Sequence, residues 1–179
     1  RDWFRSYSPV TEAEIDAVES MLGRLYEGRG LRDDADDSRL SPQDYPTLSD
    51  LYDQMGAEYR RIRNGAGGNE LYTPELLRSA CLGLHSMCKG ADSKFFDGHT
   101  NIRSARLITF GVKDLMEGGK NIKDAMLFNV LSYINHALIA GGNTAGIFEE
   151  LHVFPSNPVA VSYPRSAMKR ARKRDGRHG

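Results

Sequence analysis

The chain has 179 residues, 40% of them hydrophobic and 27% charged, and its 24 Lys and Arg equal its 24 Asp and Glu in number. This length suits one domain, or one domain with an insertion, and the composition excludes a disordered or fibrous chain. The longest apolar runs are far shorter than the roughly 20 residues of a membrane-spanning helix, and residues 1–5 do not start a signal peptide.

Three amphipathic helices are predicted in the first half of the chain, over residues 12–28, 47–63 and 73–88. A Thr-x-x-Glu capping box at Thr11 and Glu14 marks the start of the first helix. Thr47 caps the second helix, and Pro74 at a first helical position opens the third. The first half should therefore be a helical module.

Two glycine clusters raise the question of a phosphate-binding loop. The first, residues 64–69, follows a predicted helix rather than a strand and is not followed by Gly-Lys-Ser/Thr. In the second, Gly118–Lys120, Asn121 replaces the hydroxyl residue of that motif. Both clusters are therefore interpreted as turns, and the chain contains no P-loop.

The two cysteines do not indicate a disulfide or a metal site. Cys81 and Cys88 share a helix face, but seven residues of helix separate them by about 10 Å. No Cys/His cluster has metal-ligand spacing, and the five histidines are scattered. Reduced thiols fit a cytoplasmic protein.

The second half predicts a strand, a helix and a second strand. Residues 105–112 are the first strand, Asn121 caps a long helix that ends at residues 141–143, and residues 145–148 are the second strand. Such a unit has parallel strands and a right-handed crossover. The predicted fold class is mainly α with a small α/β part, and two strands cannot form a stable sheet alone.

Glu149 and Glu150 follow the second predicted strand directly. Open α/β sheets bind ligands at the carboxyl edge of their strands. One carboxylate there can support Mg²⁺ while another polarises an attacking water. A solvated strand end with no catalytic role is the plainer interpretation of the same pattern.

The charge is unevenly distributed along the chain. Residues 165–179 contain seven Lys and Arg and a single acid, which leaves 17 bases against 23 acids in the rest. This basic segment is either a solvated end or a surface that contacts phosphates of DNA or nucleotide.

Five segments, in order and spacing, resemble the C-terminal motor domain of the large cytoplasmic ATPase of conjugative type IV secretion systems. The first three are Phe95-Phe-Asp-Gly-His-Thr-Asn101, Arg106-Leu-Ile-Thr-Phe-Gly-Val-Lys-Asp-Leu115 and Leu127-Phe-Asn-Val-Leu-Ser-Tyr-Ile134. Phe148-Glu-Glu-Leu-His-Val-Phe154 is similar to the family's Walker B motif, and residues 165–176 are similar to the basic segment that follows it. Residues 10–90 correspond more loosely to the family's all-helical insertion.

The resemblance implies a RecA-like, ring-forming ATPase, of which this chain is a fragment from after Walker A to just past Walker B. The expected domains are a helical insertion-like module at residues 1–94 and a partial RecA-like segment at residues 95–179. The chain begins at Arg1 rather than at Met, and we expect it to be a piece of a longer polypeptide.

The resemblance also implies roles for particular residues. Glu150 would activate the attacking water, and Glu149, where the family more usually has Asp, would support Mg²⁺. Lys169, Arg170 and Arg172 would contact nucleotide phosphates in a neighbouring subunit, or DNA; a solvated helix is the alternative. We expect Mg²⁺ and ATP as cofactors of the parent ATPase and none for this chain alone, which lacks the P-loop and should be inactive.

Expected partners are the rest of the motor domain or other ring subunits, secretion-channel proteins at the inner membrane, and DNA. Self-association is also expected, because unpaired strands favour pairing between chains. The parent would be cytoplasmic and peripheral to the inner face of the cell membrane, and would power DNA transfer or pilus assembly. The alternative function is a non-catalytic helical interaction module whose basic tail binds DNA or a partner. A salt-sensitive affinity for DNA that is lost on truncation at Pro164 would favour this alternative.

Overall fold

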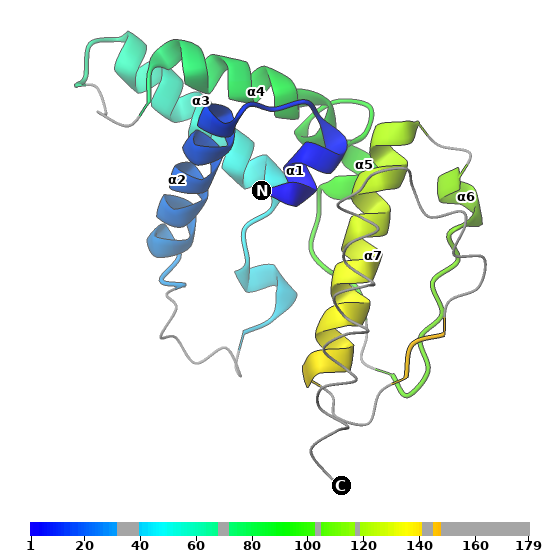
Figure 1. The fold of residues 1–179 in the computed structure, drawn as a ribbon. Coiled ribbons are helices and arrows are strands. Elements are labelled where there is room, and N and C mark those ends of the chain that lie inside the picture. The colour runs from blue at the N-terminus through cyan, green and yellow to red at the C-terminus, as the bar shows by residue number, and fades with distance from the viewer. Residues whose placement is uncertain (32–39, 68–71, 103–104, 117–118, 141–144, 148–179) are drawn as a thin grey trace, which may run out of the picture. The chain divides into compact units, whose positions relative to one another are not determined.

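The computed structural model describes residues 1–31, 40–67, 72–102, 105–116, 119–140 and 145–147. The chain divides into two compact units (Figure 1). One unit is formed by Pro9–Leu107, and the other combines Arg1–Ser8 with the described residues from Ile108 onward.

The unit Pro9–Leu107 is helical. Its elements are α2 (Glu12–Gly28), the 3₁₀-helix η2 (Pro42–Asp44), α3 (Leu48–Arg63), α4 (Pro74–Cys88) and α5 (Ser93–Phe96). The helices α2, α3 and α4 pack against one another in pairs, and α5 packs against α4. The core consists of apolar side chains at helical spacing: Ile15, Ala17, Val18, Met21, Leu51, Met55, Tyr72, Leu77, Ala80, Leu84, Met87 and Cys88.

Local capping fixes where these helices begin. Thr11 accepts a hydrogen bond from the Glu14 N–H while Glu14 binds the Thr11 N–H, and Thr47 and Asp50 repeat this box at α3. The Thr73 side chain accepts from the Leu76 N–H at α4. Each box satisfies backbone donors that a helix start leaves unpaired. The three predicted helices of the first half are confirmed.

The other unit contains α1 (Asp2–Tyr7), α6 (Lys113–Met116) and α7 (Lys120–Ala140). Both α1 and α6 pack against α7. Its buried apolar residues are Tyr7, Ala125, Leu127 and Leu131. The long predicted helix is thus present, but Asn121 lies inside its first turn instead of capping it, because α7 begins one residue earlier, at Lys120.

The mainly helical fold class is confirmed, whereas the partial parallel sheet is not found among the described residues. The segment 105–112 forms no strand, and the same holds for residues 145–147, the described part of the second predicted strand. A strand needs a neighbour to receive its backbone hydrogen bonds, and the described residues offer 105–112 none. Leu107 is 84% exposed there, while Phe110 packs edge-on against Tyr133 of α7 with ring centroids 5.6 Å apart. No helix in the described part of the chain is long and apolar enough to cross a membrane.

Candidate functional site

The site residues predicted from the sequence lie outside the described residues. This applies to Glu149, Glu150, Lys169, Arg170 and Arg172. Their roles therefore stay predictions. The polar clusters that the structure does describe belong to the helical unit Pro9–Leu107.

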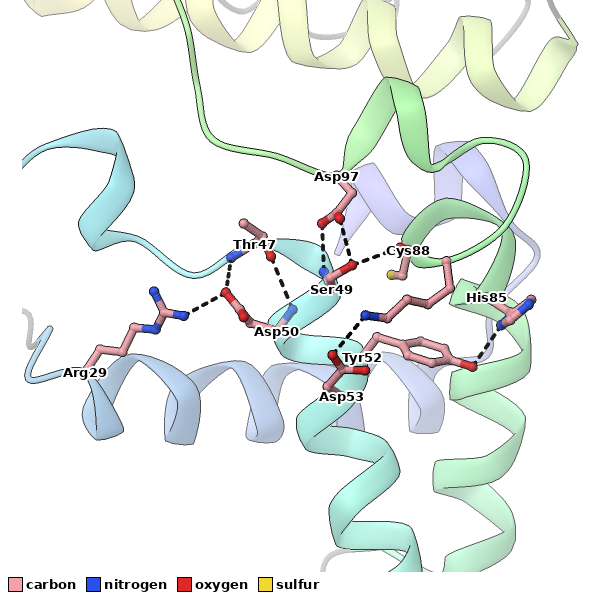
Figure 2. Close-up of polar contacts among 10 residues, drawn as sticks. Arg29, Thr47, Ser49, Asp50, Tyr52, Asp53, His85, Cys88 and Asp97 are labelled. Carbon is pink, nitrogen blue, oxygen red and sulfur yellow. Dashed lines mark hydrogen bonds and ion pairs between the residues drawn. The ribbon is translucent and has the colours of Figure 1, made fainter.

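A serine–aspartate contact joins the start of α3 to the segment after α5 (Figure 2). Asp97 accepts a hydrogen bond from the Ser49 N–H at 2.9 Å, and its second oxygen lies 2.7 Å from Ser49 Oγ. Ser49 Oγ also lies 3.0 Å from the carbonyl oxygen of Cys88 at the end of α4. Because a hydroxyl has one proton, Ser49 donates to one of these acceptors at a time. The contact connects three segments around the first turn of α3.

The neighbouring carboxylate, Asp50, completes the α3 cap and reaches α2. Its Oδ2 accepts from the Thr47 N–H at 2.8 Å and pairs with the Arg29 guanidinium at 2.7 Å. The hydrogen bond from the Thr47 backbone N–H, followed by the charge of Arg29, lowers the pKa of Asp50, while partial burial opposes this shift. Asp50 is therefore a stable anion near neutral pH.

Two further contacts connect α3 to α4 along the same side (Figure 2). The Tyr52 hydroxyl lies 2.9 Å from His85 Nδ1, and Lys89 Nζ lies 2.9 Å from Asp53 Oδ2. The hydrogen bond to Asp53 raises the pKa of Lys89, and burial raises the pKa of Tyr52. Both contacts hold the antiparallel helices in register.

A small cavity lies next to the serine–aspartate contact. Its volume is about 280 Å³. It is lined by Leu40, Pro42, Tyr45, Pro46, Gly98, His99 and Thr100. Because Asp97 directly precedes three of these residues, its bonds to Ser49 also fix one wall of the cavity.

The contacts in this network hold segments of the chain in place and do not activate a nucleophile. Activation of a serine nucleophile needs a general base within hydrogen-bond reach, most often an imidazole. Ser49 contacts a carboxylate and a carbonyl oxygen, whereas His85 contacts Tyr52. No group of three or more His, Cys, Asp or Glu among the described residues could hold a metal ion. The network therefore serves as a structural clamp.

A second cluster surrounds Glu58, about one and a half turns before the end of α3. Its carboxylate oxygens accept from Arg61 at 2.7 and 3.0 Å, from the Tyr72 hydroxyl at 3.0 Å, and from Arg24 of α2 at 3.3 Å. The Arg24 guanidinium also lies 5.8 Å from the Tyr72 ring centre. These donors, Arg61 first, lower the pKa of Glu58 to about 2. The sequence analysis did not identify this cluster, because Arg24 and Glu58 are 34 positions apart.

One comparison identifies a solved structure with the same fold. VirB4 of Thermoanaerobacter pseudethanolicus superimposes with a TM-score of 0.78 and 26% sequence identity, covering 96% of this chain and 44% of that one. This likeness supports a relation to the type IV secretion ATPases. No protein-family model matches the chain, and no curated protein matches it by sequence.

The likeness to VirB4 extends over both compact units, because it covers nearly the whole chain. The chain nevertheless spans less than half the length of VirB4. The resemblance in the five sequence segments and the structural likeness point to the same class of protein.

Proposed function

We propose that this chain is a segment of the motor of a type IV secretion ATPase, which powers DNA transfer or pilus assembly by hydrolysing ATP. The observation that carries this proposal is the superposition on VirB4 over 96% of the chain. In this proposal the helical unit Pro9–Leu107 is the insertion of a RecA-like domain, and the second half leads to its Walker B motif.

We assign Glu150 to the activation of the attacking water and Glu149 to the support of Mg²⁺. The order of the residues supports this assignment, since both carboxylates directly follow a short apolar run. Lys169, Arg170 and Arg172 are assigned to nucleotide phosphates or DNA, because they lie in the most basic stretch of the chain. When bound, Mg²⁺ would neutralise charge on the phosphates.

The nucleotide's phosphate cradle is assigned to another part of the ATPase. No Gly-x-x-x-x-Gly-Lys-Ser/Thr sequence occurs in the 179 residues, and such a loop supplies the backbone N–H groups and the lysine that hold the phosphates. We therefore expect the isolated chain neither to bind ATP tightly nor to hydrolyse it.

Titration calorimetry of the chain with Mg²⁺ and a non-hydrolysable ATP analogue tests this expectation. We expect no heat of binding at millimolar analogue. Stoichiometric binding by the isolated chain would contradict the assignment of the cradle to another segment.

The catalytic assignment is tested in an ATPase that carries this segment. Glu150→Gln should retain ATP binding and lower kcat by a factor of about 100 or more, because general-base catalysis contributes about 10²–10⁴-fold. Glu27→Gln, at an exposed position near the end of α2, is the control and should leave kcat unchanged. Full activity of the Glu150→Gln enzyme would refute the role assigned to Glu150.

A further inference from the structure

The end of α3 carries a concentration of arginines, and two of them, Arg60 and Arg63, have no role in the contacts or in the proposed function described above. Arg60, Arg61 and Arg63 occupy its last turn, and the turn Asn64–Gly67 follows. We call these three arginines and this turn the arginine tip. All three arginine side chains are exposed.

The arginine tip has a surplus of positive charge. Glu58 is the acid nearest to it along α3, and Arg24, Arg61 and Tyr72 already surround its carboxylate. Within the described part of the chain, neither Arg60 nor Arg63 forms an ion pair. Counting Arg24 and Glu58 with the tip, the described residues carry four guanidinium groups and one carboxylate, while Glu70 lies outside the described residues. In the first two turns of α4, Glu75 and Arg78 contribute charges that cancel.

A cation near a helix C-terminus is favourable in itself, because the helix dipole is negative at that end. That effect explains why basic residues are tolerated here, but a single basic residue is enough to interact with the helix dipole. The pairing of Arg61 with Glu58 supplies such a residue. Among the described residues, Arg60 and Arg63 have no acidic partner, so either can bind a ligand.

The geometry of the tip suits a chain of phosphates. Residues three apart on a helix are neighbours on its surface, with Cβ atoms roughly 5–6 Å apart, so Arg60 and Arg63 can contact one ligand together. Phosphates along one DNA strand recur about every 3.4 Å of axial rise, which lets two flexible arginines each reach a phosphate at any sequence. The planar guanidinium binds phosphate oxygens through two parallel hydrogen bonds.

The turn beside these arginines leaves room for an approaching backbone. Gly65 and Gly67 adopt φ of 82° and 66°, the left-handed region that favours glycine. A Cβ at either position would meet no atom within 4 Å. The turn is therefore open at Gly65 and Gly67, while the Arg61 guanidinium donates to the carbonyl oxygen of Ala66 between them.

The rest of the helical unit is acidic, which confines the contact to the tip. Outside the tip, residues 9–107 contain 17 Asp and Glu against 9 Lys and Arg. A polyanion is repelled by such a surface except where basic residues cluster. A basic surface on an otherwise acidic unit would hold a nucleic acid at the end of α3 that leads to α4.

We propose that the arginine tip binds the phosphodiester backbone of nucleic acid, with Arg60 and Arg63 each contacting a phosphate. This contact is distinct from the one assigned to Lys169, Arg170 and Arg172, and it does not depend on ATP hydrolysis. Its failure would leave the ATPase proposal untouched, because the tests of Glu150 measure a different property.

The test measures binding of a fluorescent 20-base-pair duplex to the full chain by anisotropy, over roughly 50–200 mM KCl. Each lost phosphate contact lowers the steepness of log K against log salt by about 0.9 for duplex DNA, so Arg60→Gln/Arg63→Gln should lower it by about 1.8. Arg60→Lys/Arg63→Lys should retain the slope, because the charge is kept. Arg78→Gln/Arg106→Gln removes the same charge at two other exposed positions and should change the slope by less than about 0.5.

An NMR titration of the unaltered chain gives an independent readout. Addition of the duplex should shift the amide signals of Gly65 and Gly67, and this result does not require any variant to fold. Circular dichroism checks that each variant keeps its helix content.

Several results would overturn the proposal. The first is an absence of duplex binding by the unaltered chain at about 50 mM KCl. The second is an equal salt slope for the Arg60→Gln/Arg63→Gln variant and the unaltered chain. The third is an equal loss of salt slope in the Arg78→Gln/Arg106→Gln control. Polyglutamate tests for an acidic protein partner. Suppose that polyglutamate displaces the duplex at an equal concentration of negative charge, and that Arg60→Gln/Arg63→Gln weakens polyglutamate binding more than duplex binding. The tip would then recognise acidic protein instead of nucleic acid.

Discussion

At the scale of single residues, Glu58 is a carboxylate that binds three other side chains. It receives donors from α2, from its own helix and from Tyr72 directly before α4. Its side chain is only 10% exposed, so water cannot replace these donors easily. A hydrogen bond to a charged group contributes about 1.5–3 kcal/mol, and a buried donor left unpaired costs a similar amount.

We predict that Glu58→Gln lowers the free energy of unfolding by about 2 kcal/mol at pH near 7, because it removes the charge that three donors share. Urea denaturation followed by circular dichroism measures this change. Glu27→Gln, on the exposed side of α2, should change stability by no more than about 0.5 kcal/mol. Equal stability of the Glu58→Gln variant and the unaltered chain would show that the charge of Glu58 does not stabilise the fold.

The pH dependence of this effect has a definite sign. The pKa of Glu58 is lowered from 4.5 to about 2 in the folded state. A lowered pKa stabilises the folded state above the unfolded-state pKa, and this stabilisation is lost as the pH falls through the folded-state pKa. The stability difference between the unaltered chain and Glu58→Gln should therefore be constant above pH 4.5 and shrink between pH 4.5 and about 2. Denaturation curves across this interval check it, and a difference that grows on acidification would contradict the assignment.

Residues that act locally were predictable, and residues that act across the fold were not. The caps at Thr11 and Thr47 were found because partners three positions apart are adjacent at a helix start. The contact between Ser49 and Asp97 joins residues 48 positions apart. Nothing in the local sequence of Asp97 shows that its partner is a backbone N–H at the start of α3.

At the scale of elements, the contact of Ser49 with Asp97 determines how the segment after α5 is held. Asp97 is followed by Gly98 at φ 139°, a conformation that side chains rarely adopt. The chain therefore changes direction directly after the residue that is fixed to α3. This pairing of a fixed carboxylate with a glycine positions His99 and Thr100 in the wall of the cavity.

We predict energetic coupling between Ser49 and Asp97. In a double-mutant cycle with Ser49→Ala, Asp97→Ala and the double variant, the coupling energy should be about 0.5–3 kcal/mol, as found for residues in direct contact. Thermal or urea denaturation measures the four stabilities. The pair Ser49 and Glu75 is the control: Glu75 is exposed at the start of α4, about 20 Å of helix away from Cys88, and its cycle with Ser49 should be close to additive. Additive effects of Ser49→Ala and Asp97→Ala would refute the coupling.

The helices were predictable as elements, but the strands were not. Amphipathic spacing and caps are properties of one segment, and they predicted α2, α3 and α4 correctly. A strand depends on a partner that supplies its backbone hydrogen bonds, and sequence pattern cannot provide that information. The β-rich composition of residues 105–112 therefore predicted a strand where the structure describes none.

At the scale of the whole molecule, residues 105–112 pair with no strand in the described part of the chain and carry an exposed apolar residue. Leu107 is 84% exposed, and Ile147 in the other strand-like segment is 90% exposed. Exposed β-rich segments with free backbone groups tend to pair with another chain. This property supports the expectation of self-association.

We predict that Leu107→Asp lowers concentration-dependent self-association of the chain, because a charge on the β-rich segment opposes strand pairing. Sedimentation velocity over a range of concentrations measures the effect. Leu82→Asp is the matched control, since Leu82 is 64% exposed but lies on α4. An equal reduction by both variants would indicate general apolar contact rather than strand pairing.

Burial of the Cys88 thiol makes it possible to measure how often α4 separates from its neighbours. The thiol is 2% exposed, and burial, with the charge of Asp97, raises its pKa to about 12. Alkylating reagents attack the thiolate, so Cys88 reacts only after α4 has opened. Cys81 on the same helix is partly exposed and serves as an internal reference in the same reaction. The ratio of the two labelling rates therefore reports how often this helix separates from its neighbours, without any introduced probe.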